Sequence, residues 1–454
     1  MKLLQRVLSF TVASAVAFSL LSVSGFAEEK RVLLTCVTAD EWTDLLYRPN
    51  QSETTWLGAD GIFTVNLNGN DSFASSNKDT NTLFFFSDTF IGKSDENGII
   101  YGDRTMPSHT AALLSGYAPD KDNIQFIYGE GGNMDPSQSL FGEYRWLFDS
   151  MVVGDSVYVL GFPEVNWTPT QVDMFRIPIE DGTPKFAEFE KTEAIPQLLH
   201  ISEDGRKISA FGIGIMCNTK QAGALNPDGY IYIYGYRATT NNIGNHLIVS
   251  RIKESDFPDF SKLTYWDGEK WGDDIEECKS LFKYVSCEMS VTPITTGPYK
   301  GKYIAIYTKN TEGPEVCYSI GDTPYGPFKI NATFYNCPEW QQPSADGVGW
   351  IYTYNAKAHP HLSREDKLLV TYNTNSRNPL SGQAADYHPR FLWLDLDPEN
   401  DLSPDVDYSL PFESFMDPRS ETFPVWIVVL AAVAFVGAGA GAFFIVKAKR
   451  KRSN

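Results

Sequence analysis

The sequence contains few cysteines and almost no helical pattern. Six Cys in 454 residues are too few for a disulfide scaffold, and no CxxC or Cys/His cluster has zinc spacing. Apolar residues rarely recur at helical spacing, which argues against a helical fold. Cys278–Cys287 and Cys317–Cys337 are the locally plausible pairs among 15 connectivities; the alternative is that these cysteines are small buried apolar residues.

Cations are also scarce, with 38 Lys and Arg against 57 Asp and Glu. Seven of the cations lie in the two chain ends, so the part between them carries 31 cations and a net charge of −26. A surface of this sign repels phosphate backbones, which argues against nucleic acid as a partner. Neutral or cationic polymers remain, and the plain alternative is that acidic residues keep a secreted protein soluble.

Long uncharged runs occur only near the ends. Residues 1–27 carry Lys2 and Arg6, an apolar stretch and then small residues, the layout of a secretory signal peptide cleaved after Ala27. The alternative is a retained N-terminal membrane helix.

The C-terminal run covers residues 424–446 and is followed by the basic tail "KAKRKR" within 447–454. A span of that length crosses a bilayer core, and the cations place its C-terminal side in the cytoplasm. "LPFES" at 410–414 has the order of a sortase signal but lacks the Thr-Gly that the reaction needs. Residues 398–423 form an acidic stalk. The sequence therefore predicts a single-pass cell-membrane protein with its N-terminal domain outside.

The remaining residues, 28–397, predict an all-β domain. Aromatics make up 14% of the chain, with 35 Gly and 26 Pro, and short alternating segments are separated by turn signals. "YIYIYGY" at 230–236 is one such strand. "SEDG" at 202–205 and "WDGEKW" at 266–271 are typical of tight hairpin turns. Other predicted strands are Ser156–Gly161, Tyr303–Tyr307, Leu368–Tyr372 and Arg390–Asp395.

Five times, a segment with polar or small residues is followed by a turn and an apolar strand. The segments lie at 56–65, 146–161, 210–219, 287–307 and 356–372. Their spacing exceeds a minimal propeller blade, which loop insertions would explain. We therefore expect a five-bladed β-propeller, whose inner strands would face a common channel. A pair of packed sheets is the alternative.

Several segments resemble a family of unknown function, DUF4185. "FFFSDTFIG" at 84–92 resembles its Phe-Gly-Asp-Thr-Phe strand, with Ser87 where Gly is usual. The segments at 250–271, 289–308, 323–328 and 358–376 resemble later parts of the same and neighbouring families, so the similarity covers Trp56–Asp397. "LGADG" stands where a Gly-Gly-Thr-Asp pattern is expected. The resemblance implies a five-bladed propeller related to furanosidases, some members being endo-D-arabinanases.

Three carboxylates each begin a proposed inner strand, in three different repeats: Asp60, Asp149 and Glu288. Glycoside hydrolysis needs one protonated and one ionised carboxyl. The resemblance implies a base, a pKa-tuning acid and a general acid, which we assign to Asp60, Asp149 and Glu288 in that order. The apolar neighbours of Glu288 would keep it protonated. For each of the three, the alternative is an acid in a turn or on the surface that takes no part in catalysis. Glycines 58 and 61 would let a ligand approach Asp60 closely.

A second group of residues could contact a substrate. Asp88 either orients neighbours beside the channel or belongs to the site. His359 and His361 in "AHPHLS" could line the channel, where a central ion is conceivable, but two histidines alone do not predict a metal or cofactor. Arg104 and His109 could reach the pocket. The tryptophans that could stack on sugars are Trp146, Trp167, Trp340 and Trp350.

Two functions of different classes follow. The first is a membrane-anchored glycoside hydrolase acting on a furanose-containing, arabinan-like polysaccharide. The second is a non-catalytic propeller that binds a glycan or protein partner at the cell surface. No oligomeric state follows from the sequence.

Overall fold

The computed structural model describes residues 32–239, 244–377 and 383–399. The predicted signal peptide, membrane span, basic tail and nearly all of the stalk fall outside these ranges. Within them, no helix combines the length and hydropathy that crossing a bilayer requires. The described part is almost entirely β-structure, as predicted. It contains one α-helix, α2 (Asp40–Leu46), and short 3-10 turns at 130–132, 186–188, 196–198, 254–256, 260–262 and 360–362.

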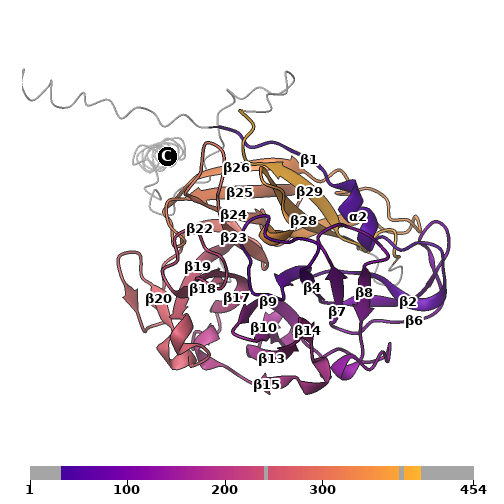
Figure 1. Cartoon of the computed structure of the whole chain (residues 1–454), viewed down its shortest axis with the longest axis horizontal. Helices are drawn as coiled ribbons and strands as arrows, with labels where there is room; N and C mark the ends of the chain where they lie inside the picture. The colour runs from indigo at the N-terminus through magenta and orange to yellow at the C-terminus, as the bar shows by residue number, and fades with distance from the viewer. Residues whose placement is uncertain (1–31, 240–243, 378–382, 400–454) are drawn as a thin grey trace, which may run out of the picture.

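Five antiparallel sheets lie around a common centre (Figure 1). The first contains β3 (Phe63–Asn66), β4 (Asn81–Phe86), β7 (Thr110–Ser115) and β8 (Ile124–Ile127). The second contains β9 (Trp146–Val153), β10 (Ser156–Phe162), β13 (Asp173–Glu180), β14 (Thr183–Pro184) and β15 (Glu190–Thr192).

The third sheet is the largest. It contains β16 (Leu199–Ile201), β17 (Lys207–Asn218), β18 (Tyr230–Thr239), β19 (Asn245–Lys253), β20 (Thr264–Trp266), β21 (Trp271–Gly272) and β22 (Phe282–Val285). The fourth contains β23 (Met289–Pro293), β24 (Tyr303–Thr308), β25 (Glu315–Gly321) and β26 (Phe328–Asn336). The fifth contains β27 (Ile351–Ala358), β28 (Lys367–Ser376), β29 (Arg390–Asp395) and the N-terminal β1 (Cys36–Thr38).

One strand of each sheet faces the centre, and these strands form a ring. β9 packs against β3 and β17, β23 packs against β17 and β27, and the ring closes where Thr64 Oγ1 bonds His359 Nδ1 at 2.8 Å. Each of the five predicted repeat segments contains all or part of one ring strand. The radial arrangement is propeller-like, and it does not fit the alternative of two stacked sheets.

The ends of the chain meet in the fifth sheet. β1 pairs antiparallel with β29, so a strand from residue 36 completes a sheet whose other strands begin at residue 351. This pairing joins the N-terminal segment of the described chain to its last sheet by main-chain hydrogen bonds. It therefore fixes the fifth sheet, which carries several residues of the candidate site, against the rest of the fold.

Local sequence explains why these strands form. The predicted hairpins are present: Trp266 pairs with Trp271, and residues 202–205 turn between β16 and β17. In β18 the tyrosines and isoleucines alternate, and Ile231, Tyr232, Ile233 and Tyr234 are all buried. Both faces of this strand are covered because neighbouring sheets pack on it.

The structure decides between the two readings of the cysteines that the sequence left open. The six cysteines, all within the described residues, are not joined in disulfides, and Cys278, Cys317 and Cys337 lie in apolar clusters. They therefore act as small buried apolar residues, the alternative reading of the sequence.

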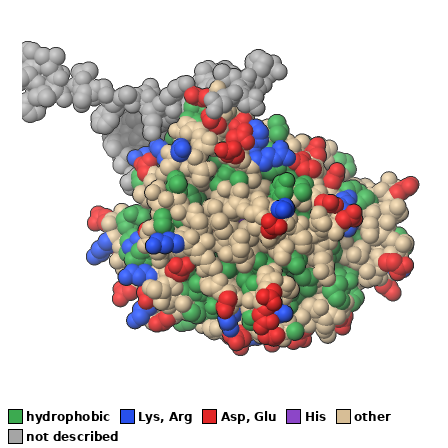
Figure 2. Space-filling view, in the orientation of Figure 1, with side chains coloured by type: hydrophobic (Ala, Val, Ile, Leu, Met, Phe, Trp, Pro, Cys, Tyr) green, Lys and Arg blue, Asp and Glu red, His purple; other side chains and the backbone are tan. Residues whose placement is uncertain are grey.

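Two further elements lie outside the five sheets and were not predicted. β2 (Gln51–Ala59), β5 (Thr89–Ser94) and β6 (Ile100–Thr105) form a three-stranded sheet, and β11 (Glu164–Val165) pairs with β12 (Thr168–Pro169). Charged side chains of both signs lie mainly along the edge of the face in Figure 2, so this face has no single acidic patch.

Candidate active site

A cavity of about 700 Å³ lies on the molecule where several sheets meet. Its carboxyl-bearing lining residues are Asp60, Asp88, Glu288 and Glu312. One wall is apolar and mostly aromatic. Trp146, Phe148 and Phe162 come from the second sheet, and Trp167 and Pro169 come from the β11–β12 hairpin. The other wall, from the fifth sheet and the segments beside it, is richer in polar groups: Tyr352, Tyr354, Asn355, Asn375, Arg377 and Tyr387.

Asp60 lies between β2 and β3, where the chain passes from the three-stranded sheet of β2, β5 and β6 to the first strand of the ring. Tyr354 Oη donates to its Oδ2 at 2.7 Å. Burial raises the pKa of Asp60, while the Tyr354 hydroxyl and the nearby Lys357 ammonium oppose the rise. Its carboxyl is thus in the cavity, as the sequence predicted.

The glycines beside Asp60 serve the fold and not a ligand. A Cβ on Gly58 would lie 1.8 Å from the carbonyl oxygen of Tyr387, and one on Gly61, whose φ is +61°, would lie 2.6 Å from Ser87 Oγ. Both positions therefore need glycine because the neighbouring chain passes too close for any side chain. The expectation that they admit a ligand is wrong.

Asp88 occupies the tight passage between β4 and β5, which belong to different sheets. The segment around it is tied to Asp60 by the main chain: Asp60 N donates to Asp88 O at 3.3 Å, and Ser87 N donates to Asp60 O at 2.9 Å. Trp146 Nε1 donates to Asp88 Oδ1 at 3.1 Å. Burial, strengthened by the charge of Asp60, raises the pKa of Asp88 to about 8. The surroundings of Asp88 therefore favour its protonated form.

Glu288 immediately precedes β23 and faces the same cavity. Asn355 Nδ2 donates to its Oε1 at 2.8 Å, and its Oε2 forms an ion pair with Lys357. Lys357 is only 2% exposed, so this is a buried pair. Burial raises the pKa of Glu288 to about 7, and the Lys357 charge opposes that rise.

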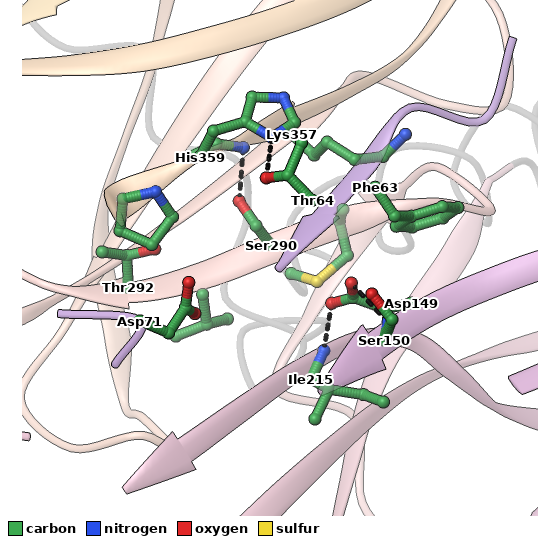
Figure 3. A pocket seen from close by; sticks show the side chains of 14 residues that line it. Phe63, Thr64, Asp71, Asp149, Ser150, Ile215, Ser290, Thr292, Lys357 and His359 are labelled. Carbon is green, nitrogen blue, oxygen red and sulfur yellow. Dashed lines mark hydrogen bonds between the residues drawn. The ribbon is translucent and has the colours of Figure 1, made fainter. Parts of the chain in front are cut away.

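Asp149 lies in a different place from the other two predicted catalytic acids. It lines a central cavity of about 30 Å³ among the ring strands. Ile215 N donates to its Oδ2 at 2.7 Å and Ser150 N to its Oδ1 at 2.8 Å. Burial raises the pKa of Asp149 to about 7. Figure 3 shows Asp149 on one side of this cavity and His359 with Thr64 on the other.

The predicted histidines are buried. His359 bonds Thr64 through Nδ1 and Thr371 Oγ1 through Nε2, both at 2.8 Å, and it lines the central cavity. Burial lowers its pKa well below the usual value, so it is neutral. His361 Nδ1 pairs with Asp71 Oδ1 at 2.6 Å. The two histidines thus make contacts within the ring and do not line the cavity of about 700 Å³, which we call the wide cavity.

Arg104 and His109 are not brought to the cavity. His109 is fully buried, with Phe141 N donating to Nε2 at 2.9 Å and Nδ1 bonding the Arg145 carbonyl. Arg104 is exposed on β6 and lies 5.2 Å from the Phe90 ring. Of the four tryptophans, Trp146 and Trp167 line the cavity, whereas Trp340 and Trp350 do not.

Sequence reasoning missed the partners of the acids. Tyr354, Asn355 and Lys357 all come from β27, where the register against β28 shifts between Tyr354 and Lys357 and Asn355 has a φ of +56°. Such a bulge re-aims side chains. A lysine inside an otherwise uncharged strand, "IYTYNAKA", was the available signal. In the described part of the chain no group of three or more His, Cys, Asp or Glu could hold a metal ion.

Comparisons with known proteins place this geometry in context. No curated protein matches the sequence. The fold is shared with a putative hydrolase from Bacteroides ovatus, at 18% identity and a TM-score of 0.58 over 84% of this chain and all of the other. A GH62 α-L-arabinofuranosidase catalytic domain from Coprinopsis cinerea aligns at 11% identity and a TM-score of 0.36, over 76% of this chain and 98% of the other.

The family expected from the sequence is wrong. The short motifs that suggested DUF4185 are each too brief to separate related families, and the match over the full domain decides otherwise. Residues 48–395 match the domain of unknown function DUF5005. The chain therefore belongs to the DUF5005 family.

Proposed function

We propose that the protein is a glycoside hydrolase and that Asp60 and Asp88 are its acid–base pair. The carrying observation is the convergence of these two carboxyls in one cavity with Glu288, although they come from three separate chain segments: between β2 and β3, between β4 and β5, and just before β23. Hydrolysis of a glycosidic bond needs one carboxyl that donates a proton and one that is ionised. Convergence of acids in a large, partly aromatic cavity supplies that arrangement.

Roles follow from the surroundings of each acid. Asp88 has no cation among the groups that set its pKa, and both burial and Asp60 keep it protonated, so it is suited to protonate the leaving oxygen. Asp60 keeps the role of base that the sequence analysis assigned to it. Burial raises the pKa of Asp60, but the Tyr354 hydroxyl and the Lys357 ammonium oppose that rise and favour its ionised form. Glu288, predicted as general acid, is paired with Lys357 and is better suited to binding or electrostatic support.

The finer features of the proposal are the blade count and the substrate. The five sheets around the ring support a five-bladed propeller. A neutral polysaccharide fits a cavity whose charged lining is mainly acidic. The furanose-containing substrate was implied only by the resemblance now replaced, so arabinan is one polymer among several to test.

The direct experiment is a screen of the purified protein against neutral polysaccharides, including arabinan, xylan, galactan and mannan, with reducing ends measured. Wild type should cleave at least one, and Asp60→Asn should not. Absence of cleavage of every polymer, at pH 5 to 8, would contradict the proposal.

One observation favours the second function, a glycan-binding propeller without catalysis. Glu288 is neutralised by Lys357, and burial raises the pKa of both Asp60 and Asp88. A cavity in which neither of these two carboxyls is ionised lacks the base that hydrolysis needs. Binding of a polymer by the wild type without any release of reducing ends would select this alternative.

We also propose membrane anchoring, supported by the sequence of residues 424–454. The full-length protein should require detergent for extraction, and a chain ending at residue 423 should be released into the medium. Recovery of the full-length chain in the soluble fraction would contradict the anchor.

A further inference from the structure

A small hairpin stands at the edge of the wide cavity. Its strands β11 and β12 pair Glu164 with Pro169 and Val165 with Thr168, so only Asn166 and Trp167 form the loop. Both loop residues have positive φ, +52° and +64°, as in a type I′ turn. Asn followed by Gly is the favoured pair in this turn, because the second residue must adopt the left-handed region.

Tryptophan is an unfavourable residue at that second position. A bulky side chain in the left-handed region clashes with its own main chain, and such strain is found mostly at functional positions. Packing does not compensate, because Trp167 is 82% exposed. Neither the turn nor the core therefore explains the indole, whereas contact with a ligand would.

Trp167 is the outer end of a row of aromatic rings. Its ring centroid lies 5.4 Å from that of Trp146, and Trp146 lies 6.2 Å from Tyr144. Trp146 and Trp167 both line the wide cavity. The same Trp146 donates to Asp88, so the middle ring of the row contacts a proposed catalytic carboxyl, while Tyr144 and Trp167 lie exposed at its two ends.

We propose that Trp167, Trp146 and Tyr144 form a subsite that stacks on consecutive sugar rings of a polysaccharide extending outward from the cavity. This inference rests on the proposed function and deepens it, since it makes the substrate a polymer and not a short glycoside. Rigid aromatic rings offer flat apolar area to sugar faces at low entropic cost. The carboxylate of Glu164, which accepts from Trp167 N, lies beside the row and disfavours an anionic chain.

The test is Trp167→Gly, which restores the favoured Asn-Gly turn. We expect an unchanged or higher melting temperature for this variant. Its binding should be at least ten-fold weaker for whichever polymer (arabinan, xylan, galactan or mannan) slows the wild-type protein in an affinity gel. With a cleaved polymer, kcat/KM should fall at least ten-fold more than for an aryl glycoside. Trp350→Gly is the matched control, since Trp350 is 55% exposed but does not line the cavity, and it should bind as wild type does.

Other outcomes decide the inference separately from the catalytic proposal. Polymer binding that depends on Trp167 without any cleavage keeps the subsite and removes the hydrolase. Wild-type binding by Trp167→Gly, equal loss in Trp350→Gly, or failure of the wild type to bind any of the polymers overturns the subsite. If Trp167→Gly melts lower, Tyr144→Ala provides the second variant, with the same loss of polymer binding expected.

Discussion

The wide cavity and the central cavity are both lined by acids, but they use them differently. In the central cavity Asp149 accepts from two main-chain N–H groups, His359 bonds two threonine hydroxyls, and about 30 Å³ of space remains. In the wide cavity about 700 Å³ is open, and Asp60 and Asp88 accept from the side chains of Tyr354 and Trp146. The side chains of Asp149 and His359 in the ring are thus satisfied by the fold, while Asp60 and Asp88 in the wide cavity are held beside space that a substrate can occupy.

We expect the largest loss of turnover for Asp60→Asn, which changes a carboxyl of the wide cavity. The amide is nearly isosteric, so the melting temperature should change little, while loss of a positioned base slows a reaction by about 10²–10⁴-fold. Turnover of the polymer found in the screen, with thermal melting as the control for folding, measures it. Wild-type turnover would remove Asp60 from the mechanism.

The next effect concerns pH and Asp88. A general acid whose pKa is raised to about 8 is active in its protonated form, so turnover should fall as the pH rises through 8. Asp88→Asn cannot donate a proton and should lower turnover by about 10²–10³-fold, least for substrates whose leaving group needs no protonation. A pH–rate profile of wild type and variant checks this.

The competing assignment has its own signature in the same experiment. If Glu288 is the acid, Glu288→Gln will produce the leaving-group dependence and Asp88→Asn will not. The descending limb of the wild-type profile would then lie near pH 7, the value to which burial raises the pKa of Glu288.

A smaller effect on catalysis, but a large one on stability, is expected at the boundary between the cavities. Lys357 lines the central cavity and its ammonium pairs with Glu288, which lines the wide one. Lys357→Met leaves a buried carboxylate without its cation, which costs about 3–5 kcal/mol in comparable cases. The double variant Lys357→Met/Glu288→Gln should recover part of the loss in urea unfolding. Additive losses would show that the pair is not coupled.

The same boundary shows how far the sequence could lead. Asp60, Asp88 and Glu288 each stand where an apolar strand begins or ends, and that local signal predicted Asp60 and Glu288 as cavity residues and left Asp88 open. Tyr354, Asn355 and Lys357 lie 294 to 297 positions from Asp60, on a bulged strand whose register no local pattern reveals. The two-residue turn that exposes Trp167 was likewise missed, because Asn-Trp is not a favoured hairpin pair.

Asp149 should show the smallest effect on activity. The family resemblance implied that Asp149 tunes the other acids, whereas in the structure it lines the central cavity and accepts from main-chain N–H groups. Asp149→Asn should therefore lower turnover less than ten-fold, and a loss as large as that of Asp60→Asn would restore the tuning role.

The burial of Asp149 should instead show in how the stability of the protein depends on pH. The pKa of Asp149 is raised to about 7 in the folded chain and is about 3.9 in an unfolded one. The folded state therefore favours the neutral carboxyl, and wild-type stability is lost as the pH rises from about 4 through 7. Asparagine stays neutral throughout but can accept only one of the two N–H bonds, so its melting temperature at low pH can lie below that of wild type. The melting temperature of the variant minus that of wild type should become more positive between pH 4 and 7 and stay constant above pH 7. A difference in melting temperature that does not change with pH would show that Asp149 is not protonated in the fold.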